Sequence, residues 1–133
     1  MGTGDFTALD KVCAAFTSET GEFDNDAAYE ASAFLSRGVL HAYCVYVEAK
    51  YNELSEFAGT LNGLTDSDIQ DFVAELRKFG ITHFTVLMQK GPVYEFANVL
   101  WALQGLGCKF CGVSEVLQEK PQPQATLGLK VGL

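Results

Sequence analysis

The feature that most constrains this fold is a helical hydrophobic pattern that changes directly into a strand pattern near the middle of the chain. Between Thr65 and Gly80, apolar residues recur at the 3.6-residue spacing of an amphipathic helix. The eight residues 81–88 (ITHFTVLM) that follow are rich in β-branched and aromatic types, which favour a strand. Thr65 is typical of a helix N-cap and Gly80 of a left-handed helix end. The chain therefore combines helices with a sheet.

The rest of the chain extends this pattern to four helices and three strands. Helices are predicted over residues 5–18, 26–50, 66–79 and 92–104, and strands over 81–88, 108–117 and 126–132. Gly38 is expected to kink or interrupt the second helix, and 53–64 to be irregular with one short extended piece. The helix between the first two strands is long enough for them to pair in parallel, with the last strand antiparallel to the second.

These elements predict an α/β (or α+β) protein with a small mixed sheet. The chain has 133 residues, of which 48% are hydrophobic and 20% charged, which fits one domain over residues 1–133 and excludes disorder. Its N-terminal half is predicted to be helical, and its C-terminal half to have β-α-β-β order. No apolar run approaches the roughly 20 residues of a membrane span, and no secretion signal is recognised. A cytoplasmic location is expected.

Charge is distributed unevenly along the chain. The formal net charge is −8, composed of −11 over residues 1–76 (14 acidic and 3 basic) and +3 over residues 77–133 (6 basic and 3 acidic). An acidic half repels a phosphate backbone, so direct binding of duplex nucleic acid is not expected. It can instead be attracted to a basic protein surface. The alternative is that these charges only keep the protein soluble.

The residues predicted to bind a partner are acidic. They are Glu53, Glu56, Asp66, Asp68, Asp71 and Glu75. Asp68, Asp71 and Glu75 follow one another at helical spacing, so we expect them to share a solvent face. The alternatives are a divalent-ion site and simple compensation of the helix dipole. No metal and no cofactor is predicted.

Other reactive groups give weaker signals, and we predict that the protein is not an enzyme. Lys90 and Gly91 stand between a strand and a helix, where free amides could hold a small anion, so an anion-binding or catalytic site is the alternative function. His41 and His83 have no evident nucleophile beside them and are predicted to be structural. Cys108 and Cys111 have C-x-x-C spacing, but the motif leads into a strand and lacks a second ligand pair for zinc. The cysteines are therefore expected to be reduced, ordinary thiols.

Two runs of sequence carry a resemblance to a known group of proteins. They are Asp68-Ile69-Gln70-Asp71-Phe72 with Leu76-Arg77 and Gly80-Ile81-Thr82-His83-Phe84-Thr85, and Gly107-Cys108-Lys109-Phe110 with Gly112-Val113-Ser114-Glu115-Val116. Over residues 65–116 the chain resembles a family of small uncharacterised proteins carried on phages and integrative mobile elements of gut bacteria. The resemblance implies an accessory protein that binds host machinery, as inhibitors of defence nucleases do. It implies no catalytic residue.

Together these observations predict a mobile-element or phage accessory protein that binds a basic surface of a host protein. Inhibition of a defence nuclease, in the manner of an anti-CRISPR, is the sharper form of this prediction. Carboxylates would occupy positions meant for phosphates, so binding should weaken with salt. A further alternative is a homo-oligomeric regulatory module in which the long helix over 26–50 forms the interface.

Overall fold

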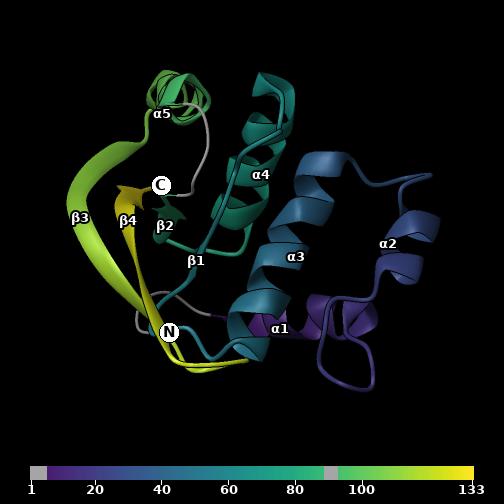
Figure 1. Cartoon of the computed structure of the whole chain (residues 1–133). Coiled ribbons are helices and arrows are strands. Elements are labelled where there is room, and N and C mark those ends of the chain that lie inside the picture. The colour runs from purple at the N-terminus through teal and green to yellow at the C-terminus, as the bar shows by residue number, and fades with distance from the viewer. Residues whose placement is uncertain (1–5, 89–92) are drawn as a thin grey trace.

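In the part of the chain that the structure describes, the protein has a four-stranded mixed sheet and five α-helices (Figure 1). The structure, a computed structural model, describes residues 6–88 and 93–133. The elements in chain order are α1 (Thr7–Cys13), a 3-10 helix (Ala14–Phe16), α2 (Asn25–Ala31), α3 (Arg37–Tyr51), β1 (Ala58–Gly59), α4 (Asp66–Lys78), β2 (His83–Leu87), α5 (Val93–Gly105), β3 (Lys109–Gln118) and β4 (Gln124–Gly132). The predicted α/β class is confirmed. Among the described residues no helix is long and apolar enough to cross a membrane.

The long helix predicted over 26–50 is wrong, because it is two helices, α2 and α3. The break lies before Gly38, at Ser36, whose extended backbone lets its hydroxyl accept a hydrogen bond from the Val39 amide (3.3 Å). The Asp24 carboxylate caps α2 in the same way. The first predicted helix is also shorter than expected, because α1 continues as the 3-10 helix instead of as α-helix.

Gly38 is needed where α3 and α4 cross. A Cβ at this position would overlap the backbone carbonyl of Asp68 and lie 2.8 Å from the Asp71 Cβ. The glycine therefore allows a close approach of two helices and does not interrupt α3. Seven of the fifteen residues of α3 are buried within the protein itself, including Ala42, Tyr43 and Val47. A homo-oligomer formed through this helix, the alternative raised by the sequence, could use only the residues that this packing leaves exposed.

The sheet has the strand order β1-β2-β4-β3, with β1 parallel to β2 and the other two pairs antiparallel. The parallel pairing of β2 with β3 predicted from the sequence is wrong, because β4 lies between them. The expected antiparallel pairing of the last two strands is confirmed, and β1 is the short extended piece expected within 53–64. It adds the fourth strand.

The core joins α3 and α4 to the apolar face of β2. The Phe84 ring lies 5.1 Å from that of Phe72 on α4 and 5.0 Å from that of Phe57, measured between ring centroids. Both contacts have edge-to-face geometry, which aromatic pairs favour. Phe72 and Phe84 are almost completely buried. This core fixes α4 relative to the sheet and so positions the site described next.

Candidate functional site

A large cavity lies between α4 and α5. It has a volume of about 710 Å³ and is lined by Leu64, Asp66, Ser67, Gln70, Asn98, Trp101, Ala102, Gly105 and Leu106. A second hollow of about 270 Å³ shares Leu64, Asp66 and Asn98 with it and continues to Tyr94 and Glu95. We call the two hollows together the α4–α5 groove. The groove is large enough to receive several side chains of a binding partner.

Aromatic side chains of α5 stand exposed beside this groove. Trp101 is 70% exposed and Tyr94 is 67% exposed, whereas Val99 and Leu103 on the same helix are buried. The helix therefore has one apolar face in the core and a second in solvent. Tryptophan and tyrosine are the residue types that contribute most to binding at protein interfaces.

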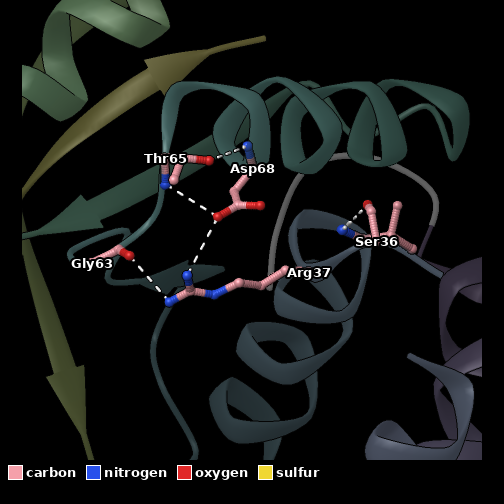
Figure 2. A network of polar contacts seen from close by, with 6 residues as sticks. Ser36, Arg37, Gly63, Thr65 and Asp68 are labelled. Carbon is pink, nitrogen blue, oxygen red and sulfur yellow. Dashed lines mark hydrogen bonds and ion pairs between the residues drawn. The ribbon is translucent and has the colours of Figure 1, made fainter. Parts of the chain in front are cut away.

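Polar contacts hold the start of α4 in place at one end of the groove (Figure 2). The Thr65 hydroxyl accepts from the Asp68 amide and the Asp68 carboxylate accepts from the Thr65 amide, each at 3.1 Å, which is a capping box. Arg37 donates to the Gly63 carbonyl (3.1 Å) and lies 3.6 Å from the same carboxylate. The network ties the N-terminus of α3 to that of α4.

A second contact holds the other end of the groove. The guanidinium of Arg77, on the last turn of α4, donates to the Leu106 carbonyl just beyond α5 (2.9 Å). This bond joins the end of α4 to the end of α5, whereas the network around Arg37 joins α4 to α3 and positions the start of α4. Together the two sets of contacts hold α4, which forms one wall of the groove, in a defined place.

The six predicted acidic residues do not form one surface. Asp66 is exposed and lines the groove, and Glu53 is exposed but lies 3.5 Å from Lys120. Asp68 is engaged in the capping box, and Asp71 is half-buried beside α3. The dispersed carboxylates do not make the single docking patch that the sequence suggested.

Two more of the six, Glu75 and Glu56, also have structural roles. The expectation that Glu75 faces solvent is wrong, since it is 7% exposed and accepts a hydrogen bond from the Tyr43 hydroxyl. Glu56 is half-buried, and its carboxylate accepts from Thr85 (2.6 Å) and Ser114 (2.8 Å). Neither carboxylate can be presented freely to the surface of a partner.

Sequence reasoning missed the aromatic side of the groove. The apolar residues of the helix predicted over 92–104 include Trp101, but their spacing does not tell which of them solvent reaches, and Tyr94, Glu95 and Asn98 carry no signal of their own. The usable signal was that the segment 93–103 is apolar on both faces. Because only one face of such a helix packs against the core, the other apolar face is left exposed. Lys90 and Gly91, the alternative anion site, lie outside the described residues.

The histidines and cysteines show no arrangement for nucleophilic or metal chemistry in the described ranges. His41 contacts the Thr60 carbonyl through its Nε2 (2.7 Å), and burial lowers the pKa of this imidazole. Burial also raises the pKa of the Cys13 and Cys44 thiols to about 12, so both stay protonated at neutral pH. Cys108 is buried and Cys111 is exposed, and neither is in a disulfide. Within these ranges no three such side chains gather at a metal site.

The fold and the groove define a small α/β domain with an exposed aromatic surface and no recognised reactive centre among its described residues. The chain belongs to a family described as a domain of unknown function (DUF7698), whose model matches residues 39–126. No curated protein and no solved structure matches the chain. The match includes α4, α5 and β3 in full, so the α4–α5 groove lies entirely inside the family's part of the chain. Helices α1 and α2 lie outside it.

Proposed function

We propose that this protein is a non-catalytic binding domain that receives a segment of another protein in the α4–α5 groove. The observation that carries the proposal is the exposure of Trp101, 70%, at the side of a 710 Å³ cavity. An indole left in water beside a preformed hollow gains from contact with an apolar side chain of a partner. Tyr94 extends this aromatic surface toward the start of α5.

The charge of the groove defines the chemistry of that partner. Asp66 and Glu95 line it, and neither is in an ion pair with a described residue. The whole chain carries a net charge of −8. A segment with lysine or arginine beside an apolar anchor would therefore complement the groove in both charge and polarity. The sequence predicted that a broad acidic face binds the partner. The site proposed from the structure is instead an aromatic groove with two carboxylates, those of Asp66 and Glu95.

The biological setting remains the one that the sequence suggests. The partner we propose is a host protein with a basic surface, and the sharper proposal is a defence nuclease whose basic surface the protein covers. What supports it is the acidic charge, the aromatic groove and the resemblance over residues 65–116. Occupancy of such a surface would inhibit without any chemical step.

The test is a selection of displayed peptides on the purified protein. Peptides that contain an aromatic or aliphatic residue near lysine or arginine should be enriched, and their binding should weaken as salt increases. Trp101→Ala should reduce their affinity by about tenfold or more, and Asp66→Asn by a smaller factor. Tyr29→Ala and Asp26→Asn are matched controls, because both residues are exposed on α2 far from the groove's lining. Equal loss in the controls, or peptides without basic residues, would contradict the proposal.

A further inference from the structure

A second cavity lies on the polar face of the sheet, away from the groove. It has a volume of about 190 Å³ and is lined by Phe6, Ser55, Glu56, Phe57, His83, Phe84, Thr85 and Lys130. Alternate residues of a strand point to the same side, so His83 and Thr85 share a face of β2. Lys130 of β4 is the register partner of Thr85 and lies beside it on that face. The register therefore brings an imidazole and an ammonium group together.

The Glu56 carboxylate is held in this cavity by two hydroxyl groups. Its Oε1 accepts from Thr85 Oγ1 at 2.6 Å and from Ser114 Oγ at 2.8 Å, which joins the segment before β1 to β2 and β3. Gly128, the register partner of Ser114, leaves room for this arrangement, because a Cβ there would lie 2.5 Å from Thr85 Cγ2. Thr85 is 1% exposed, so the hydroxyl that positions the carboxylate is itself fixed. The carboxylate is thus preorganised.

The charges that line the cavity are opposite but not paired with each other. Among residues 6–88 and 93–133, neither Glu56 nor Lys130 is in an ion pair, and no described group bonds to Glu56 Oε2. A simple anion attracted by Lys130 would be repelled by Glu56, and a simple cation would be repelled by Lys130. A ligand that carries both charges satisfies both groups. The unpaired charges thus select for a zwitterion.

We propose that this cavity binds a small zwitterion of the free α-amino acid class. The ligand's ammonium group would contact Glu56 Oε2, and its carboxylate would contact the Lys130 ammonium and the imidazole of His83. Phe6, which is half-buried, provides an apolar surface for the ligand's side chain. The volume equals that of about six water molecules, so the ligand must be small. This site is independent of the α4–α5 groove and of the binding function proposed for it.

The test is titration of the full-length protein with the common α-amino acids, followed by thermal denaturation and calorimetry. At least one amino acid should raise the melting temperature in a saturable way, because a ligand that binds the folded state stabilises it. Acetate and ethylammonium, which each carry one of the two charges, should not do so at the same concentration. The proposal would be overturned if no amino acid raised the melting temperature. It would also be overturned if acetate raised the melting temperature as much as an amino acid does.

Two variants and a control locate the binding. Glu56→Gln keeps an oxygen acceptor for the two hydroxyls and removes the charge, and Lys130→Met removes the ammonium group. Each should weaken the affinity for the amino acid about tenfold or more while the ligand-free melting temperature stays close to that of the parent. Lys109→Met, at an exposed lysine of β3 outside the cavity, should leave the affinity unchanged. If Lys109→Met weakens binding as much as Lys130→Met does, the amino acid does not bind in this cavity.

Discussion

The hydroxyl of Tyr43 on α3 donates a hydrogen bond to the carboxylate of Glu75 on α4, and both residues are buried. Burial, together with the neighbouring carboxylate, raises the pKa of Tyr43 above its ordinary value, so the phenol remains a donor at neutral pH. Lys78 lies 3.8 Å from the same carboxylate and is mostly exposed. The tyrosine is thus the buried partner of a buried acid.

Removal of the Tyr43 hydroxyl should destabilise the protein. In Tyr43→Phe the Glu75 carboxylate keeps only the exposed Lys78 nearby, and a buried acceptor without its partner costs about 1–3 kcal/mol. Urea denaturation of the variant should show this loss in the free energy of unfolding. The double variant Tyr43→Phe with Glu75→Leu should recover part of it, because the buried carboxylate is then absent. A loss that is unchanged in the double variant would show that the hydrogen bond is not its cause.

A methyl group at Gly38 should separate α3 from α4. Gly38→Ala places a Cβ against the Asp68 carbonyl, and overpacking of this kind costs about 1–3 kcal/mol. Gly105→Ala is the matched control, since a Cβ at this last position of α5 meets nothing within 4 Å. The control should be neutral or slightly stabilising, because alanine favours helix over glycine. Chemical denaturation of both variants distinguishes the two effects, and equal changes would contradict the close crossing.

The capping box of α4 should contribute more to stability than the ion pair beside it. Thr65→Ala removes a side-chain acceptor for a free helix amide, at a cost of about 1 kcal/mol. Arg37→Met should cost less, since the Arg37 side chain is 64% exposed and exposed pairs contribute about 0–1 kcal/mol. Thermal melts at low and high salt provide the measurement. A larger, salt-sensitive loss in Arg37→Met would reverse this ranking.

The stability of the protein should fall as pH decreases through the histidine range. Burial lowers the pKa of His41 from the ordinary value of 6.5, so the folded state binds the proton less readily than the unfolded chain does. The contribution is fully present above the unfolded pKa and is lost as pH falls from there through the lowered folded pKa. Denaturation from about pH 7.5 to about pH 5 should show this slope, and His41→Gln should reduce it. An unchanged slope in His41→Gln would assign it to other groups.

Trp101 should report directly on the groove. It is the one tryptophan of the chain, so all indole fluorescence comes from it. At 70% exposure its emission should be typical of an indole in water and should be quenched by iodide. A peptide bound in the groove should shift the emission to shorter wavelength and reduce quenching. Emission typical of a buried indole in the free protein would contradict this exposure.

Local signals were sufficient for most elements of the fold. The helix at 66–79 was predictable because its cap, its apolar spacing and its terminal glycine all agree. Ser36 divides α2 from α3 by a single hydroxyl cap, and a serine in a long apolar pattern gives little warning of this. The position of β4 between β2 and β3 depends on which strand edges remain unpaired after the other elements have packed. This is a property of the whole molecule and cannot be predicted from any one segment.

The site was less predictable than the fold. Carboxylates at helical spacing suggested a shared solvent face, but the crossing of α3 and α4 buries Glu75. Glu56 could not be connected to Thr85 and Ser114 without the strand register. The exposure of Trp101 could not be predicted, because periodicity places a side chain on a helix face and does not tell what covers that face.

The central position of β4 also affects how the nascent chain folds during translation. Residues 124–132 are translated after both of the strands that they separate, so a nascent chain ending at Gln118 holds β2 and β3 with open edges. Open edges of this kind are templates for pairing between chains. Strand β4 joins β3 to the rest of the sheet, so a nonsense mutation just before residue 124 should yield aggregates and not a shorter folded domain.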